Sequence, residues 1–486
     1  MTDAAIVGTG PNGLAAAVTL ARAGLQVSLH EQSDTVGGGL RSMPLFDSAV
    51  LHDICSAVHP MAAASAFFRA FDLPARGVRL LQPDIPYAHP LPGGHAAAAW
   101  RSITRTADHL GVDGPRWTRL LGPLAARSHA VVDLFLSDQR SLPRDLVTPI
   151  LLARRLLAPT TSHTPFTTPE ANALLTGVAA HAVGKLPSLA STAVALLLAQ
   201  TAHASGWPLP EGGSNRIADA LIADITAHGG TFHTSHRVTD LAELSDAPLV
   251  LLDVSPKEFL AIAGDRLPTR YRQALHRYRY GPGAAKVDFL VSEPIPWANP
   301  LLRQAGTVHL GGTHSDIFRQ ENATAAGQRI PDPFTLVVEP AVTDPTRASN
   351  RKHPVWAYAH VPNGDTRDPL RMIRARIEEY APGFTDTIIT SRGLSAAQYE
   401  TYNPNYVGGD IGSGTLTLRQ TLARPTLRLH PYTTPLPGVY LCSAATPPGP
   451  SVHGMCGYLA ALAALRRHHG MRTSPDLSPK SEEELV

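Results

Sequence analysis

The stretch that decides the fold is AAIVGTGPNG, at residues 4–13. Its first four residues form a short apolar run that predicts a strand, and residues 14–23 are small, apolar helix formers. Between them, Gly8 permits a tight turn, Gly10 lets a pyrophosphate approach the backbone, and Gly13 lets the helix pack close to the strand. The start of the helix then presents unpaired N–H groups to the phosphates. The stretch therefore predicts a dinucleotide-binding turn.

A second strand, predicted over residues 26–30, ends at Glu31. An acidic residue at this position can accept hydrogen bonds from ribose hydroxyls. The strand, turn, helix and second strand make a βαβ unit of about 30 residues. The glycine pattern alone is a weak signal, because glycine-rich chains contain it by chance. Its place between a strand and a helix, with Glu31 after it, favours a nucleotide site over a purely structural turn.

The composition excludes several classes of protein. A chain of 486 residues with 43% hydrophobic and 17% charged content can bury a large core and is long enough for roughly two or three domains. The formal net charge is +2 and no basic run is interleaved with aromatics, so no nucleic-acid partner is expected. Cys55, Cys442 and Cys456 lack Cys-x-x-Cys spacing, which predicts no disulfide framework or zinc site and fits a reducing, cytoplasmic setting. The chain enters a strand pattern at once, which leaves no room for a signal peptide.

The order of the segments predicts an α/β fold (α+β overall) with a Rossmann-like dinucleotide-binding domain and an interleaved substrate domain of mixed sheet and helices. The dinucleotide-binding domain is expected from three separated segments, residues 1–65, 206–262 and 401–470. The substrate domain is expected from residues 66–205, which are rich in Ala, Leu and Pro and mostly helical, and from a sheet and helix in residues 263–400. Residues 471–486 are expected to form a disordered tail.

Residues 146–157 are strongly apolar and carry Arg154 and Arg155. Such a stretch fits a helix that lies on a membrane surface. It also fits a helix that lines an internal apolar pocket, which is the commoner case. No segment offers the roughly 20 uninterrupted apolar residues that cross a bilayer. Peripheral membrane contact therefore stays open beside the pocket interpretation.

A second glycine cluster follows Glu31. Residues 37–41 read GGGLR, and Arg41 can offset phosphate charge while the glycines admit a cofactor at close range. Near the other end of the chain, residues 437–458 give a strand, a Gly/Pro turn and the start of an Ala/Leu helix. The two stretches resemble the second and the closing FAD motifs of the flavin amine oxidase superfamily. The resemblance implies FAD as the cofactor, although Ser443 stands where relatives usually carry glycine.

Four middle segments resemble the phytoene-desaturase-like branch of that superfamily. They are residues 278–288, 306–313, 356–364 and 403–411. The resemblance covers nearly the whole chain and is least clear over residues 61–203, where a substrate would be selected. The chain has no second Gly-x-Gly-x-x-Gly for a nicotinamide cofactor and no cysteine pair, so NADPH-driven disulfide reduction is a poor interpretation.

These motifs define the expected site residues. The expected cofactor contacts are Gly8, Gly10, Pro11, Asn12, Gly13, Glu31, Gln32, Gly38, Gly39, Leu40, Arg41, Val238, Ser443, Ala444, His453, Gly454 and Met455. The resemblance alone implies Tyr406 and Gly408 at the substrate pocket. No metal site is expected, because the sequence has no His-Glu-x-x-His helix, and no Ser/His/Asp hydrolase signature is visible.

Two residues are candidates for catalysis. Lys286 begins an alternating strand in a context resembling the amine oxidase lysine that contacts the flavin N5 through a water; a surface lysine is the competing interpretation. His453 lies beside the predicted start of the flavin-facing helix and is a candidate base, against a structural histidine that bonds a carbonyl. Cys456 could in principle attach the flavin, but a small buried cysteine is expected.

A flavin of this class accepts a hydride at N5, so the protein needs to hold a substrate C–H bond against the ring and exclude water. We therefore expect an FAD-dependent oxidoreductase that desaturates or otherwise oxidises C–C bonds of an apolar small molecule, bound by the Ala/Leu-rich insert. A flavin amine oxidase is one alternative, and a flavin-binding scaffold or chaperone-like protein without turnover is another. Oxygen and a quinone both stay open as the electron acceptor.

Overall fold

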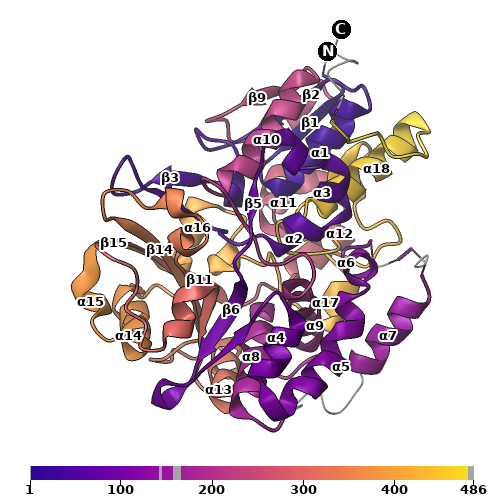
Figure 1. Ribbon diagram of the computed structural model, residues 1–486. Coiled ribbons are helices and arrows are strands. Elements are labelled where there is room, and N and C mark those ends of the chain that lie inside the picture. The colour runs from indigo at the N-terminus through magenta and orange to yellow at the C-terminus, as the bar shows by residue number, and fades with distance from the viewer. Residues whose placement is uncertain (1, 139, 142–144, 157–165, 480–486) are drawn as a thin grey trace.

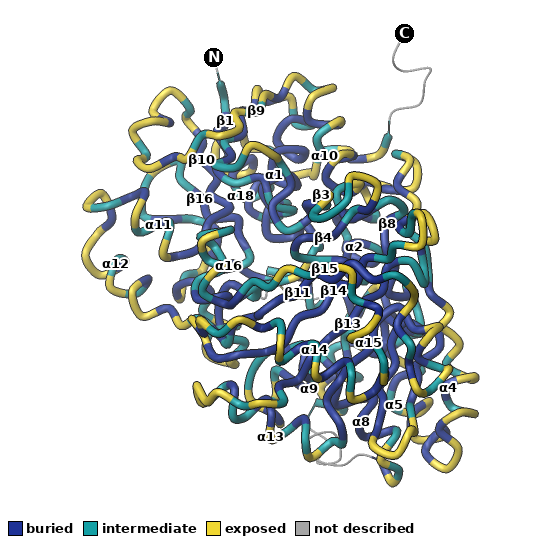
Figure 2. The backbone as a smooth tube through the Cα atoms, turned by 90° about the vertical axis from the view of Figure 1, so that its left-hand side faces the viewer, coloured by how far each residue is buried: buried dark blue, intermediate teal, exposed yellow. Residues whose placement is uncertain are grey.

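The computed structural model describes residues 2–138, 140–141, 145–156 and 166–479. Figure 1 shows two regions, a parallel sheet with its helices at the top and a larger sheet with a group of helices below it. The interior of both regions is buried (Figure 2).

The upper sheet has five parallel strands in the order β16-β10-β1-β2-β9. Its members are β1 (Ala4–Val7), β2 (Val27–His30), β9 (Thr231–His233), β10 (Leu249–Leu252) and β16 (Val439–Leu441). β1 and β10 are buried over their whole length, as strands covered by helices on both faces must be. The sheet is therefore assembled from the beginning, the middle and the last part of the chain.

Helices from the two ends of the chain meet on this sheet. α1 (Pro11–Arg22) packs against α18 (Met455–His469) and against α10 (Asn215–Ala227). A Cβ added at Gly457 would lie 1.8 Å from the carbonyl oxygen of Asn12. Only glycine therefore lets α18 approach the first turn of α1 this closely.

The lower sheet has seven strands in the order β15-β11-β14-β13-β12-β6-β7. These are β6 (Ile85–Pro90), β7 (Ala96–Ala99), β11 (Gly283–Val291), β12 (Ala305–Leu310), β13 (Thr335–Val338), β14 (His353–Val361) and β15 (Ile388–Leu394). β12 pairs with β6 in parallel and the other pairs are antiparallel. One face packs on α14 (Leu370–Tyr380) through residues such as Val287 and Val355. The predicted fold class, α/β with a mixed second sheet, is confirmed.

The described part of residues 66–205 contains the strands β5, β6 and β7 besides its helices. β6 and β7 join the lower sheet from within this segment, which the sequence predicts as mostly helical. The partner of β6 is β12, which comes much later in the chain, so the strand depends on a pairing that local sequence does not reveal. The segment thus contributes both helices and part of the sheet.

The remaining elements complete the two regions. The helices of residues 60–202 are α2 (Pro60–Ala64), α3 (Ala66–Phe71), α4 (Ile103–His109), α5 (Gly114–Ala125), α6 (Ser128–Phe135), α7 (Val147–Leu156), α8 (Pro169–Ala179) and α9 (Leu189–Ala202). Later helices are α11 (Pro256–Ala263), α12 (Thr269–His276), α13 (His314–Ala325), α15 (Phe384–Thr387), α16 (Ala396–Tyr402) and α17 (Leu418–Leu422). Two small sheets pair β3 (Ser42–Pro44) with β4 (Leu51–Asp53) and β5 (Leu80–Leu81) with β8 (Leu209–Pro210). Across the described ranges, no helix is both long and apolar enough to cross a bilayer.

The segment after α18 is packed rather than free over residues 471–479, so the predicted disordered tail is wrong for this part. Leu477 is buried in the core of the upper region. Arg76 donates to the Leu477 carbonyl at 2.9 Å, and Arg22 donates to the Ser478 carbonyl at 2.7 Å. Both arginines also pair with the buried carboxylate of Asp224. Residues 480–486 lie outside the described residues.

Candidate functional site

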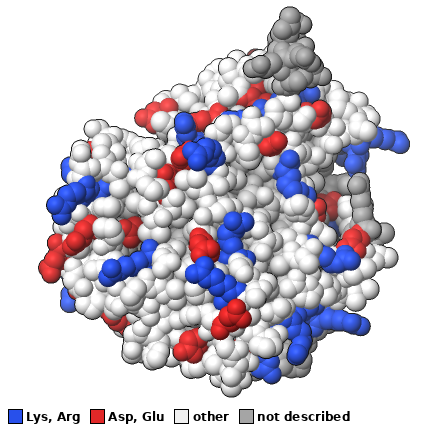
Figure 3. All heavy atoms as spheres, viewed as in Figure 1, with Lys and Arg blue, Asp and Glu red and all other residues white. Residues whose placement is uncertain are grey.

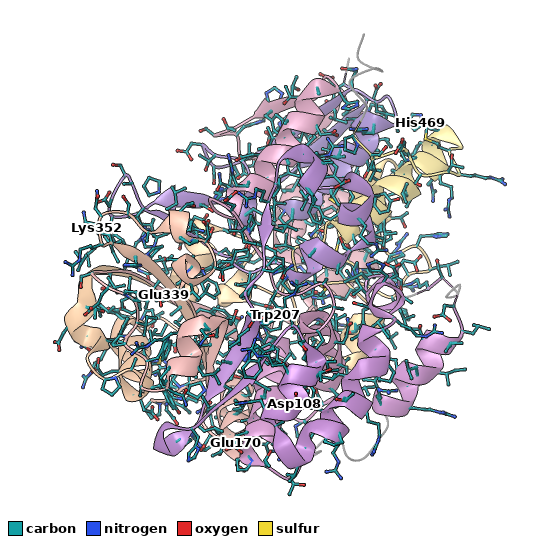
Figure 4. The ribbon with its side chains drawn as sticks, viewed as in Figure 1. Asp108, Glu170, Trp207, Glu339, Lys352 and His469 are labelled. Carbon is teal, nitrogen blue, oxygen red and sulfur yellow. The ribbon has the colours of Figure 1, made fainter. Side chains whose placement is uncertain are left out.

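A cavity of about 700 Å³ runs from the glycine turn of the upper sheet to the helices beside the lower sheet. Its walls come from strand ends of both sheets and from α6, α9, α16 and α17. Trp207, one of its lining residues, lies near the middle of the molecule where the two regions meet (Figure 4). The cavity therefore connects the predicted nucleotide site with the region where a substrate was expected.

The glycine turn has the geometry that its sequence predicts. Gly8 adopts a φ of +91°, and a Cβ on it would lie 2.8 Å from the carbonyl oxygen of Asp253. A Cβ on Gly13 would lie 2.1 Å from the Gly8 carbonyl oxygen, which explains how α1 packs so close to β1. Gly38, from the second glycine cluster, lies so close to Gly10 that a Cβ added to it would be 2.8 Å from the Gly10 Cα. The two glycine motifs thus form one bare backbone surface at the cavity wall.

Glu31 organises the hydrogen bonds around this surface. Its carboxylate accepts from the backbone N–H of Thr9 at 3.2 Å and of Ser33 at 3.0 Å. Arg41 donates to the same carboxylate at 3.2 Å and to the hydroxyl of Tyr402 at 3.2 Å. Arg41 is therefore held beside the glycines by an ion pair that the sequence analysis did not foresee.

The unsatisfied atoms of this wall fit a dinucleotide. Asn12 Oδ1 and Arg41 Nε are buried and have no hydrogen-bond partner among the described residues, and both side chains line the cavity. Buried polar atoms are normally paired, so these two are suited to a ligand rich in hydrogen-bonding groups. Gly10 and Gly38 line the same wall, and only their lack of side chains lets the two glycine motifs meet there; together with the unpaired atoms they make a site that fits FAD.

Most of the predicted cofactor residues meet at this cavity. Those that line it are Gly8, Gly10, Pro11, Asn12, Glu31, Gln32, Gly38, Gly39, Arg41, Val238, Ser443 and Ala444. Val238 lies beyond the end of β9 at His233, after Ser235, whose φ is +52°. Ser443 uses its hydroxyl to accept the N–H of Ala445 at 3.3 Å, within its own turn.

Several predicted residues lie behind the wall instead. Leu40 is fully buried in the core, and Gly13 and Met455 belong to the start of helices that pack there. A Cβ on Gly454 would lie 2.6 Å from the Phe67 ring, so this glycine serves packing. Gly408, with a φ of +62°, is closed off by Asn363, whereas Tyr406 does line the cavity. All of these residues except Tyr406 therefore support the site from behind its wall.

The prediction of His453 as a base is wrong for this geometry. Its imidazole is buried, its Nε2 bonds the Gly449 carbonyl at 3.0 Å, and its Nδ1 accepts the N–H of Met455 at 2.9 Å. Burial lowers the pKa of His453 to about 4. Both ring nitrogens are thus engaged, and the neutral ring fixes the turn that leads into α18.

Lys286 lies behind the cavity wall, and the competing interpretation of a surface lysine is wrong, because its side chain is buried. Its ammonium is buried, donates to Asp288 at 2.6 Å and to the Asp53 carbonyl at 2.8 Å, and lies 5.9 Å from the centre of the Trp356 ring. Residues two apart on a strand share a face, so Lys286 and Asp288 form an ion pair within β11. The lysine therefore lies next to Trp356, which does line the cavity.

The cavity also contains residues that the sequence analysis missed. Asp253 follows β10 directly and accepts the N–H of Gly13 at 2.9 Å. Burial, assisted by the negative charge of Glu31, raises the pKa of this carboxyl to about 7. An acidic residue directly after a buried parallel strand was the available signal, because strand ends of a parallel sheet meet at one edge.

Aromatic rings gather on the middle part of the wall. Trp356 and Tyr358 of β14 lie with ring centres 5.1 Å apart, and Tyr399 and Tyr406 lie with theirs 5.9 Å apart. Tyr406 accepts a hydrogen bond from Cys55, another lining residue, at 3.3 Å. Lone aromatics scattered through the sequence gave no sign of this grouping.

The far end of the cavity is apolar. Ala190, Ala193, Val194, Leu197 and Leu198 of α9 all face it, at the i, i+3, i+4 and i+7 spacing of one helix face. Leu136, Leu156 and Val183 add to the same wall. Leu156 belongs to α7, so this end of the apolar stretch 146–157 lines the pocket while Val147 and Ile150 point outward. In the part of the chain that the structure describes, no group of three or more His, Cys, Asp or Glu is arranged to hold a metal.

Comparisons with known proteins agree with this architecture. The model of a family described as flavin containing amine oxidoreductase matches residues 12–314. Pyridine nucleotide-disulfide oxidoreductase domain-containing protein 2 of Mus musculus is 22% identical over 96% of this chain and 93% of its own length. The Rattus norvegicus protein of the same name is 24% identical over 54% of this chain, a match that spans about half, 51%, of that protein.

A solved structure has the same fold at low identity. Cyclohexylamine oxidase from Brevibacterium oxydans IH-35A superposes with a TM-score of 0.58 and 15% identity, covering 96% of this chain and 99% of that chain. The predicted resemblance to the flavin amine oxidase superfamily is confirmed by the family match.

Proposed function

This chain belongs to the flavin-containing amine oxidoreductase family, and from that premise we propose that it desaturates or otherwise oxidises C–C bonds of an apolar small molecule. The coarser statement, an FAD-dependent oxidoreductase, follows from the family itself. The finer one rests on a single observation, the aliphatic face of α9 along the far end of the cavity.

That face favours an apolar ligand because it offers nothing to a charged one. Its five side chains are Ala, Val and Leu, and burying apolar surface against them gains about 25 cal/mol per Å². An ion in the same place would lose its hydration without a partner. The face therefore selects molecules that carry hydrocarbon into the cavity.

The chain's own residues hold the cofactor and exclude water. Gly10 and Gly38 leave room for the dinucleotide, Arg41 supplies positive charge, and Glu31 fixes Arg41 in place. When bound, FAD supplies a hydride acceptor at N5. The aromatic wall of Trp356, Tyr358 and Tyr406 and the α9 face keep the reacting end of the cavity poor in water.

The test is to purify the protein with FAD and to follow anaerobic bleaching of the flavin with polyenes, cyclic alkenes and amines. The proposal expects bleaching by a polyene or a cyclic alkene and none by the amines. Bleaching by amines alone would overturn it. A protein that takes up no FAD would remove its premise.

Amine oxidation is the second candidate, and the aromatic wall favours it. Rings such as Trp356 and Tyr358 can attract an amine through their electron-rich faces. Besides Phe135 and Trp207, five aromatic side chains line the cavity: Trp356, Tyr358, Tyr399, Tyr402 and Tyr406. The amine arm of the same experiment decides between the two substrates.

A scaffold or chaperone-like role without turnover is the remaining alternative. It expects bound FAD that no member of the substrate panel reduces, although dithionite reduces it. Reoxidation of the reduced flavin by oxygen or by a quinone analogue, measured by stopped flow, then tests the two open electron acceptors.

Contact with an anionic bilayer is proposed as the route by which an apolar molecule reaches the cavity. Exposed apolar side chains occur on α7 and α17, which both contribute residues to the cavity wall, and on the chain next to these helices; we call them the rim patch: Leu146, Val147, Ile150, Leu418, Leu422, Leu427 and Leu429. Arg140, a few residues before Leu146, donates to the carbonyls of Leu422 and Arg428 and so connects the chain before α7 with the chain around and after α17. The exposed Arg154 and Arg419 add positive charge that suits anionic lipid.

Two further expectations accompany this proposal. A cytoplasmic location is supported by the three cysteines, all of which are free. Absence of a nucleic-acid partner is supported by the interspersed positive and negative side chains on the face shown in Figure 3.

A further inference from the structure

A histidine pair borders the apolar end of the cavity. His181, in the short turn that follows α8, lines the cavity, and His309 of β12 lies behind it. Their Nε2 atoms are 3.0 Å apart, so one ring donates a hydrogen bond to the other. Trp207 meets His181 edge-on with ring centres 5.6 Å apart. The pair is thus fixed in position by hydrogen bonding and by packed rings.

Neighbouring groups indicate which ring of the pair donates the hydrogen bond. His89 Nε2 lies 2.7 Å from the Gly312 carbonyl oxygen and must donate to it, which leaves His89 Nδ1 as an acceptor. His89 Nδ1 and His309 Nδ1 both face Gly177, where an added Cβ would lie 2.9 Å from the first and 3.0 Å from the second. Each Nδ1 is buried without a hydrogen-bond partner among the described residues.

No hydrogen bond joins the two Nδ1 atoms, but two lone pairs that face the same space would repel, so the favoured arrangement puts the proton of His309 on Nδ1, toward the lone pair of His89. His309 Nε2 then accepts from Nε2–H of His181. This leaves Nδ1 of His181 as a lone pair, and no described group donates to it. A neutral state suits all three rings, because burial lowers the pKa of His89 to about 4 and of His181 to about 3.

We propose that His181 Nδ1 is the polar anchor of the substrate subsite and accepts a hydrogen bond from a hydroxyl on an otherwise apolar molecule. The inference rests on the proposed function and narrows its substrate class to an apolar alcohol. Ala182, Val183, Leu197 and Leu198 surround this end of the cavity with hydrocarbon, so a hydroxyl placed there has few alternatives. An unpaired buried hydroxyl is costly, which makes the single acceptor selective.

Thr307 is the competing anchor. It lines the same cavity, and its hydroxyl is buried without a partner among the described residues. Trp207 is not a competitor, because its indole N–H already donates to the Leu198 carbonyl at 3.1 Å. A Thr307→Val variant keeps the shape of the side chain and removes the hydroxyl, and so provides the matched comparison.

The experiment measures binding, not turnover. The FAD-loaded protein is titrated calorimetrically with cyclooctanol, cyclooctyl methyl ether and methylcyclooctane, which share their hydrocarbon ring. The alcohol should bind about tenfold more tightly than the ether, as one hydrogen bond to a buried acceptor predicts. In His181→Phe this ratio should fall to about one, in Thr307→Val it should persist, and in His181→Gln part of it should return.

Several results would contradict the assignment of His181 as the anchor. Equal affinities for the three probes in the unaltered protein would overturn the anchor, as would a preference that survives His181→Phe or disappears in Thr307→Val alone. Should His181→Phe not fold, nitrogen NMR of the unaltered protein with labelled histidine replaces it, since cyclooctanol but not the ether should shift Nδ1 of His181. An alcohol preference without flavin bleaching by any substrate would refute the proposed oxidation and leave the anchor in place.

Discussion

At the scale of single residues, the carboxyl of Asp253 beside the glycine turn makes the stability of the folded protein depend on pH. The pKa of its buried carboxyl is about 7 in the folded chain and about 3.8 when exposed. The folded state therefore holds the proton more tightly, and stability falls as pH rises from about 4 to about 7 and then levels off. Asp253→Asn keeps an acceptor for the Gly13 N–H and removes this loss. It should raise Tm by about 3 °C at pH 8 and by much less at pH 5, measured by differential scanning fluorimetry.

The exposed Asp34 is the control for that substitution. Asp34→Asn should leave Tm nearly unchanged at both pH values, because the side chain reaches solvent. An equal gain at pH 5 and pH 8 for Asp253→Asn would show that its carboxyl does not titrate in this range.

Gly10 is the second single residue for which we predict an effect, in this case on FAD binding. Gly10 lines the cavity where the diphosphate is expected, and an added Cβ would lie 2.8 Å from Oδ2 of Asp253, another residue of this wall, so one of the two must move. Gly10→Ala should weaken FAD binding at least about tenfold, or about 1.4 kcal/mol, read as flavin content and by titration. Gly122→Ala, in α5 with its nearest atoms 3.7 and 3.8 Å away, should bind FAD normally. Equal losses in both variants would point to general destabilisation.

At the scale of secondary-structure elements, the α9 face decides what enters the cavity. Ala193→Phe places a ring in the apolar end and should abolish bleaching by an apolar substrate while flavin content stays unchanged. Ala223→Phe on the exposed side of α10 is the matched control and should retain both properties. Anaerobic spectroscopy measures both, and undiminished bleaching in Ala193→Phe would mean that substrate lies elsewhere.

The secondary-structure elements also show which parts of the fold and the site could be predicted from the sequence. The glycine turn, Glu31 and α1 were predictable because the pattern that defines them is local, one strand, turn and helix followed by the next strand. Asp253 was missed because it reaches the turn only through the pairing of β10 with β1, two strands from distant parts of the chain. The burial of Lys286 was predictable, since Asp288, its partner in an ion pair, stands two residues later on the same strand face.

The substrate end was the least predictable part. β6 looked like part of a helical segment because its partner β12 is distant, and the grouping of His181, Trp207 and His309 depends on that pairing. Packed rings and helix faces from several segments carry no local signal. Composition could indicate an apolar pocket, but only the fold assigns its walls.

At the scale of the whole molecule, the rim patch should govern attachment to membranes. Leu427 is 82% exposed and Ile150 58%, so Ile150→Glu combined with Leu427→Glu should sharply reduce flotation with vesicles of anionic phosphatidylglycerol. Val112, 78% exposed on another element, supplies the control Val112→Glu, which should float like the unaltered protein. Equal flotation of all variants, or a concentration-dependent dimer that the double variant abolishes, would assign the patch to another role.

The five-stranded parallel sheet has a consequence for how the protein is made. Its central strand, β1, leaves the ribosome long before its edge strand, β16. Until β16 and the following helix are made, the glycine turn lacks α18, which packs against α1, and the early βαβ unit must wait with apolar surface uncovered. Cofactor capture should consequently be a late event of biosynthesis. Nascent chains halted before residue 430 should remain colourless and bound to chaperones, whereas completed chains acquire flavin.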